Sequence, residues 1–186
     1  MNTKTIKATL FSLLMSINAL SFAGNTTMQE THLGQRILDK QKIIDLLAPA
    51  EGSLTPLKLR GIKIIQPQAA EAAAPRSISM QINFEFNSHQ LTGASLQQLK
   101  PVGEALASQQ LSRSMFAVEG HTDAVGSENY NLALSKKRAE TVKSFFIQRY
   151  GIEARRIAVQ ARGEYELFDK QNPNSGANRR VRIVAR

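Results

Sequence analysis

The sequence predicts an α/β protein, a two-layer sandwich in which two helices pack on one face of a mixed four-stranded sheet. Apolar residues alternate with polar ones in four short segments, which is typical of half-buried strands. In two longer segments they recur every three or four residues, which is typical of amphipathic helices. The order along the chain is β-α-β-α-β-β, and helices placed between strands favour a sheet that the helices cover.

The pattern is clearest from residue 77 onward. The first strand is expected at 77–86, and the first helix of this region follows at 93–109, although it contains Pro101 and Gly103. The apolar positions have the strand and helix spacings in turn: Ile78, Met80, Ile82, Phe84 and Phe86, then Leu96, Leu99, Val102 and Leu106.

A long second helix is expected after the loop at 120–126. Ser127 is a suitable N-cap because its hydroxyl can accept a hydrogen bond from a backbone N–H of the first turn. Gly151 is expected to end this helix, since glycine readily adopts the left-handed conformation found after helix C-termini. The remaining elements are expected to be strands at 115–119, 157–161 and 180–185.

Residues 1–23 have the three parts of a secretory signal peptide. Two lysines precede a mostly apolar run at 8–20, and Ser-Phe-Ala at 21–23 is a small-x-small cleavage site. An uncleaved membrane anchor is the alternative, but the run is shorter than the roughly 20 apolar residues that a spanning helix needs. We therefore expect a mature chain that begins at Gly24, lies in the periplasm and has no transmembrane segment.

The residues after the signal are expected to form an N-terminal segment at 24–75 and a folded domain at 76–186. An amphipathic helix is expected at about 33–48, where apolar residues recur at helical spacing. Residues 57–65 fit one or two short strands, and residues 66–75 are rich in Pro and Ala and fit a linker.

Composition and charge exclude several classes of protein. The chain has 186 residues, a formal net charge of +9 and no cysteine. The lack of cysteine excludes disulfide scaffolds, thiolate metal sites, a cysteine nucleophile and a lipidated N-terminal cysteine. The basic charge favours an anionic partner. Nucleic acid is not expected, because the protein is exported and its basic residues are scattered without an aromatic-rich motif.

The sequence does not favour catalysis. None of the three histidines has the spacing of a known metal or catalytic motif, and nucleophile-elbow, P-loop and dinucleotide motifs are absent. His121 and Asp123 could ligate a metal or form a dyad, but no third ligand is near them in the sequence. We therefore expect a protein that is not an enzyme and that holds neither metal nor cofactor.

A carboxylate and a guanidinium are expected to converge where the second helix begins. Asp123 follows a strand, in the loop that leads into this helix. Asn131 and Arg138 are seven positions apart, so two helical turns place them on one face, about 10 Å apart. Such a pair could bind a small ligand that carries both an ammonium and a carboxylate group. Alternatively, Asp123 only orders the loop and Arg138 is a solvated charge.

Four motifs of this region resemble the signature of the OmpA-like peptidoglycan-binding domain. This module occurs in outer-membrane protein A, in peptidoglycan-associated lipoproteins and in flagellar stator proteins. The resemblance covers about residues 78–185, and the expected order of elements agrees with the family fold. The motifs are Phe86-Asn87-Ser88, Gly120 to Gly126, Asn131 to Ala139, and Asn178-Arg179-Arg180-Val181.

The resemblance implies non-covalent binding of the diaminopimelate side chain of peptidoglycan. Asp123 would accept the ammonium group of the ligand, and Arg138 would hold its carboxylate. At position 87 the family commonly has aspartate, so Asn87 keeps a carbonyl acceptor but loses a charge. The other residues that the motifs place along the lining or the rim of the pocket are Asn131, Thr122, Arg179 and Arg180.

Three functions are compatible with the sequence. The first is a cell-wall anchor that binds peptidoglycan in the periplasm, with outer-membrane association left open. The second is a protein that the wall-binding module only localises, and whose residues 24–75 bind an envelope protein partner. The third is a wall-modifying enzyme, which would need catalytic groups that the sequence does not show.

Overall fold

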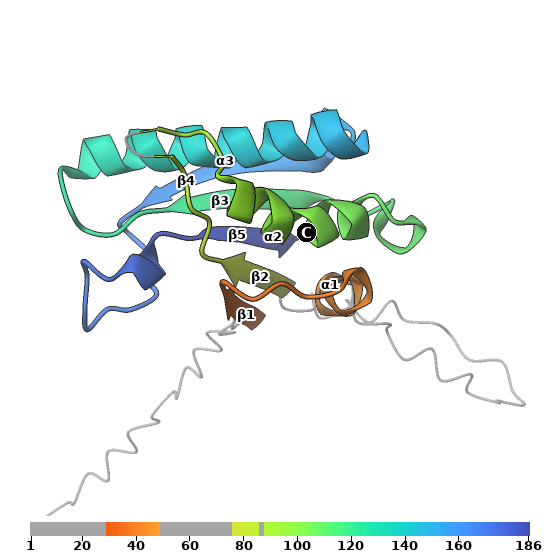
Figure 1. The fold of residues 1–186 in the computed structure, drawn as a ribbon, viewed down its shortest axis with the longest axis horizontal. Coiled ribbons are helices and arrows are strands. Elements are labelled where there is room, and N and C mark those ends of the chain that lie inside the picture. The colour runs from red at the N-terminus through yellow and green to blue at the C-terminus, as the bar shows by residue number, and fades with distance from the viewer. Residues whose placement is uncertain (1–28, 49–75, 86–87) are drawn as a thin grey trace, which may run out of the picture.

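The computed structural model describes residues 29–48, 76–85 and 88–186. The expected signal peptide, the linker, the strands at 57–65 and Asn87 lie outside these residues. A mixed five-stranded sheet with the order β1-β2-β5-β3-β4 forms one layer (Figure 1). Its strands are β1 (Gln29–Gly34), β2 (Arg76–Met80), β3 (Phe116–His121), β4 (Ile157–Gly163) and β5 (Val181–Ala185).

Three helices pack against this sheet through one continuous core (Figure 1). They are α1 (Lys40–Leu47), α2 (Gly93–Leu106) and α3 (Glu128–Tyr150). The core joins Leu99 of α2 and Phe146 of α3 to Val118 and Ile183 of the central strands. The α/β class and the helices on one face are thus confirmed. In the described part of the chain, no helix combines the length and the apolar composition that crossing a membrane requires.

The sheet has five strands and not the expected four, because β1 forms an additional strand at its edge. β1 pairs in parallel with β2, in a ladder that runs from Gln29 opposite Arg76 to Gly34 opposite Met80. β2 and β3 both pair antiparallel with β5, and β3 pairs in parallel with β4. The sequence Gln-Glu-Thr-His-Leu-Gly of β1 lacks the alternation of apolar residues that identifies a half-buried strand.

The expected helix at 33–48 is shorter than the sequence suggested. Leu33 belongs to β1, Gly34 with φ 59° ends that strand, and α1 begins only after Asp39. The carboxylate of Asp39 caps α1 by accepting a hydrogen bond from the backbone N–H of Lys42 at 2.9 Å. The apolar spacing that suggested one long helix therefore spans a strand, a turn and a short helix.

The long helix α3 begins and ends where the sequence predicts. Ser127 caps it by accepting a hydrogen bond from the backbone N–H of Tyr130 at 3.3 Å. Gly151 ends it in the left-handed conformation with φ 65°. The helix α2 ends at Leu106, three residues before the expected end, and β2 ends at Met80, although Phe84 and Leu91 form one further bridge.

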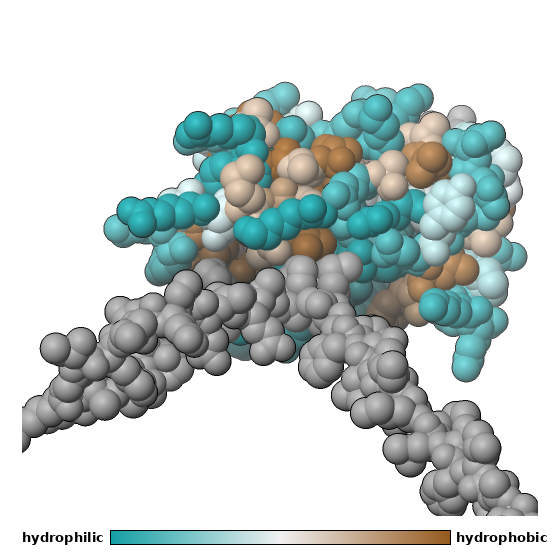
Figure 2. Space-filling view, turned by 180° about the vertical axis from the view of Figure 1, so that it is seen from behind, coloured by the Kyte–Doolittle hydropathy of each residue, from teal (hydrophilic) through white to brown (hydrophobic). Residues whose placement is uncertain are grey.

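The two faces of the sheet have different surroundings. The helices cover one face and enclose the apolar core with it, and the molecular surface seen from behind carries hydrophobic and hydrophilic residues interspersed (Figure 2). Within β3, Phe116 and Val118 belong to the core, and Glu119 and His121 alternate with core positions. Since successive side chains of a strand point to opposite faces, Glu119 and His121 belong to the face that the helices do not cover.

Candidate binding site at the start of helix α3

The loop between β3 and α3 is fixed by backbone hydrogen bonds. The N–H of Thr122 donates to the carbonyl of Gly163 at 2.8 Å, which ties the loop to the end of β4. The N–H of Ala124 donates to the carbonyl of Pro173 at 3.1 Å. Asp123 lies between these two anchors, so its carboxylate has a defined position.

Strand β3 touches the backbone of helix α3 at Gly120. A Cβ atom on Gly120 would lie 2.1 Å from the carbonyl oxygen of Ser135, so no larger residue fits without a backbone shift. The hydroxyl of Ser135 also accepts a hydrogen bond from the N–H of Gly163 at 3.0 Å. These contacts fix the first half of α3 against the strand ends from which the Asp123 loop departs.

Arg179 supplies a counter-charge for Asp123. Nη1 of Arg179 donates to Oδ2 of Asp123 at 2.7 Å, and the N–H of Val125 donates to Oδ1 at 3.3 Å. Asp123 is buried, whereas about half of the Arg179 side chain is exposed. The structure thus brings Asp123 and Arg179 together and places the arginine at the surface.

Arg138 presents a half-buried cation beside this pair. Its guanidinium lies over the ring of Phe84, 4.7 Å from the ring centroid. Burial, together with the positive charge of Arg179, lowers the pKa of Arg138, but a guanidinium stays protonated in proteins. Among the described residues, the buried Nε of Arg138 has no hydrogen-bond partner. An anionic group of a ligand could satisfy it.

The side chain of Asn131 stabilises the loop between β3 and α3 by hydrogen bonding. Its side chain is buried, and Nδ2 donates to the carbonyl of Val125 at 3.1 Å and to Oε2 of Glu164 at 2.5 Å. Both N–H groups of this amide are therefore used within the protein, and no pattern in the sequence indicates Glu164 as its partner. Thr122 is also buried, and its Oγ1 has no hydrogen-bond partner among the described residues.

The expected position of Arg180 at the rim of the pocket is corrected. Its side chain is buried, Nε lies 3.6 Å from Oε1 of Glu30, and Nη1 donates to the carbonyl of Glu166 at 3.1 Å. Arg179 contacts Asp123, whereas the side chain of Arg180 contacts Glu30 and Glu166 instead.

A cavity of about 220 Å³ opens beside Arg138. The short loop before α2 forms one wall and the first three turns of α3 form the other. Ser88 and His89 of this loop therefore border the cavity. The full lining consists of Ser88, His89, Tyr130, Ala133, Leu134, Lys137 and Arg138.

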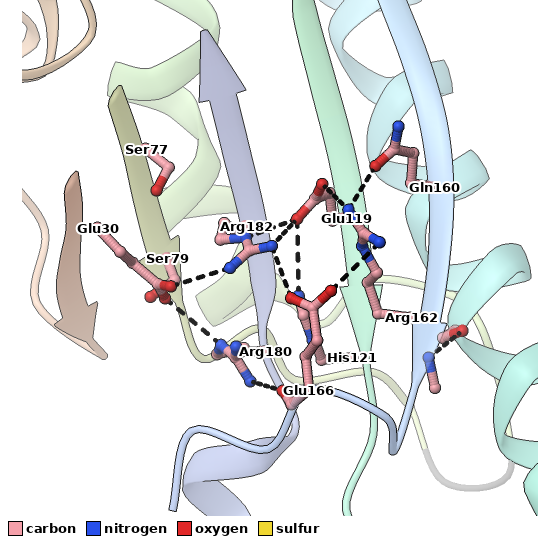
Figure 3. A network of polar contacts seen from close by, with 12 residues as sticks. Glu30, Ser77, Ser79, Glu119, His121, Gln160, Arg162, Glu166, Arg180 and Arg182 are labelled. Carbon is pink, nitrogen blue, oxygen red and sulfur yellow. Dashed lines mark hydrogen bonds and ion pairs between the residues drawn. The ribbon is translucent and has the colours of Figure 1, made fainter. Parts of the chain in front are cut away.

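The sequence did not reveal a polar network on the open face of the sheet. Side chains from all five strands meet there (Figure 3). Arg182 of β5 contacts Glu119 at 2.5 Å, Glu166 at 2.8 Å and Glu30 at 3.1 Å, and Arg162 contacts Glu119 at 2.8 Å. One feature of the sequence could have indicated this network. Charged or histidine residues occupy every second position near the ends of β3 and β5, as residues on one face of a strand do.

This network is better explained as salt bridges than as a metal site. Donor atoms of Glu119, His121 and Glu166 lie within 4.8 Å of one another, as the ligands of an ion would. The guanidinium of Arg182 already bridges the two carboxylates. Three arginines balance the three glutamates of the network, so a divalent cation would add uncompensated charge in a buried site.

The free energy of unfolding should fall as the pH is lowered from 6.5 to 4.5. Burial, with the charges of Arg180 and Arg182, lowers the pKa of His121 to about 2. The unfolded chain binds this proton near pH 6.5 and the folded chain does not, so the stability present above pH 6.5 is lost as the pH falls. Over this interval the loss is about 2.3 kcal/mol, because the unfolded histidine is already half protonated at pH 6.5.

Urea denaturation at the two pH values measures this loss. His121→Gln should lose less stability between them than the wild type. His89→Gln, which changes an exposed histidine, should behave like the wild type. A pH dependence unchanged in His121→Gln would contradict the assignment.

The fold and the site define a class of protein, an α/β binding domain that presents a paired carboxylate and guanidinium where a strand leads into a helix. A model described as the OmpA family matches residues 83–181. The match covers more than half of the chain, which therefore belongs to the OmpA family.

Several curated proteins are similar to the chain. The outer-membrane lipoprotein YfiB of Pseudomonas aeruginosa is 32% identical over 157 residues, which cover 75% of this chain and 92% of that protein. The peptidoglycan-associated lipoprotein of Buchnera aphidicola is 28% identical over 103 residues, which cover 55% of this chain and 58% of that protein. Outer membrane porin F of Pseudomonas aeruginosa is 30% identical, and the chain spans only 24% of its length.

The fold also matches solved structures. The OmpA-like domain of FopA1 from Francisella tularensis aligns with a TM-score of 0.50 and 17% identity, over 59% of this chain and 71% of that domain. Similarity at this level of identity concerns the fold alone.

Proposed function

We propose that this protein binds peptidoglycan non-covalently in the periplasm and anchors itself or a partner to the cell wall, without catalysing a reaction. Membership of the OmpA family supports the proposal, as does the similarity to a protein named as peptidoglycan-associated. The observation that carries it is Arg138, a half-buried cation with an unsatisfied Nε beside the carboxylate of Asp123.

The proposed ligand is the end group of diaminopimelate, which carries an ammonium and a carboxylate on one carbon atom. Arg138 would hold the carboxylate, since a guanidinium offers parallel N–H donors to two oxygens. Asp123 would accept the ammonium. Its bonds to Arg179 and to the N–H of Val125 leave lone pairs free, because a carboxylate has about four acceptor positions.

The expected affinity is modest. Hydrogen bonds to charged groups contribute about 1.5–3 kcal/mol each. Two to three of them give roughly 3–9 kcal/mol, a range that includes dissociation constants from millimolar to micromolar. Because the wall repeats its peptide many times, rebinding would keep the protein associated with the wall.

Co-sedimentation with isolated sacculi tests the proposal. Sacculi whose peptides contain diaminopimelate should retain the protein. Sacculi with lysine at that position should bind at least about tenfold more weakly, because lysine lacks the carboxylate that Arg138 would hold. Equal binding to both kinds of wall would contradict the proposed ligand.

Recruitment of an envelope partner by the N-terminal segment would depend on the apolar stripe from Leu33 to Leu47. The structure buries Leu33, Ile43, Ile44 and Leu47 of this stripe in the core of the domain. These side chains are therefore not available to a partner.

A further inference from the structure

A polar groove continues from the candidate site along the surface of helix α3. A second hollow, of about 440 Å³, adjoins the cavity beside Arg138, because His89 and Lys137 line both. Each of its lining residues has a polar group in its side chain; they are His89, Gln90, Lys137, Glu140, Thr141 and Ser144.

The helix wall of this groove is a single stripe of residues. Tyr130, Lys137, Thr141 and Ser144 follow one another at spacings of seven, four and three, which places them on one face of α3. The stripe is about 21 Å long at the helical rise of about 1.5 Å per residue. The core of the domain uses other positions of the helix, such as Phe146.

Lys137 is the charge in this groove that is free to meet a ligand. Glu140 also lines the groove, and its Oε1 lies 4.0 Å from Nζ of Lys136, the neighbour of Lys137. Within the described part of the chain, Lys137 takes part in no such ion pair, and its side chain is exposed. A negatively charged group in the groove would therefore meet an unpaired cation.

We propose that the groove binds the wall peptide to which the diaminopimelate belongs, with Lys137 holding a second carboxylate of that peptide. This inference rests on the proposed function. With the end group at Arg138, the rest of the peptide leaves the cavity, and the groove is an open path that begins there. An extended peptide rises about 3.3 Å per residue, so the stripe accommodates about six residues.

The lining of the groove suits a peptide. Hydroxyl, amide and imidazole groups can exchange hydrogen bonds with a peptide backbone. An ion pair between an exposed ammonium and a carboxylate contributes little binding free energy. We therefore expect Lys137 to raise the affinity slightly, and Asp123 and Arg138 to provide most of it.

Calorimetric titration of the full mature chain with two probes tests this inference. The probes are free diaminopimelate and the tetrapeptide released from diaminopimelate-containing walls. The tetrapeptide should bind more tightly to the wild type. Lys137→Ala should weaken tetrapeptide binding about three- to fivefold, as expected for one exposed ion pair, and should weaken binding of free diaminopimelate less. Lys143→Ala is the control, because Lys143 lies on the same helix outside the groove.

The outcomes separate this inference from the proposed function. Equal affinities of the wild type for both probes would overturn the groove and leave the end-group site in place. Lys137→Ala would also overturn the groove if it bound the tetrapeptide like the wild type or weakened both probes alike. If neither probe binds the wild type, the proposed function fails, and the groove fails with it.

Discussion

Asp123→Ala and Arg138→Ala should each abolish co-sedimentation with diaminopimelate-containing sacculi. Without Asp123, the ammonium of the ligand faces the two cations Arg138 and Arg179. Without Arg138, the carboxylate of the ligand loses its partner and faces Asp123. Truncating one member of a desolvated charge pair costs about 2–5 kcal/mol, or at least roughly thirtyfold in affinity.

Both variants should remain folded. The Asp123→Ala variant loses the ion pair with Arg179, whose side chain is half exposed, and such pairs contribute only about 0.2–1 kcal/mol to the free energy of unfolding. Arg138 has an unsatisfied Nε, so its removal breaks no bond at that atom among the described residues. Thermal unfolding should therefore show small shifts. Arg149→Ala is a matched control, because this arginine lies in the last turn of α3, and it should bind like the wild type. Wall binding by either folded variant at the wild-type level would disprove the site.

Removal of the N-terminal segment should destabilise the domain severely. Leu33, Ile43, Ile44 and Leu47 are buried, and burying such a side chain contributes about 1.5–3 kcal/mol. The free energy lost with these four side chains is comparable to the free energy of unfolding of a whole domain, roughly 5–15 kcal/mol. A shorter chain also loses less conformational entropy when it folds, which offsets part of this loss. Deletion also removes Glu30, the partner of the buried Arg180 and Arg182.

Urea denaturation of residues 24–186 and 76–186 measures this effect. The longer chain should unfold cooperatively, and the shorter one should aggregate or unfold without a cooperative transition. Leu47→Ala in the longer chain is a milder version and should cost about 2–5 kcal/mol. A cooperative transition of similar stability in residues 76–186 would instead support the domain boundary at residue 76 that the sequence suggests.

Much of the candidate site could be predicted from the sequence. The position of Asp123 after β3, the cap at Ser127 and the placement of Arg138 on α3 all follow from short-range patterns. The partners of these residues could not be predicted. Arg179 is 56 residues from Asp123, and Glu164 is 33 residues from Asn131. The motif alone did not distinguish Arg179, which reaches Asp123, from Arg180, which is buried beside Glu30.

The sequence by itself determined the α/β class, the ends of α3 and the order of the elements after residue 76. Helix periodicity and caps depend on residues up to four positions apart, and such contacts are visible in a linear pattern. The tertiary structure alone decided the fifth strand, the polar network and the groove. β1 is a polar segment that becomes a strand because β2, which begins at Arg76 opposite Gln29, offers its edge for hydrogen bonding.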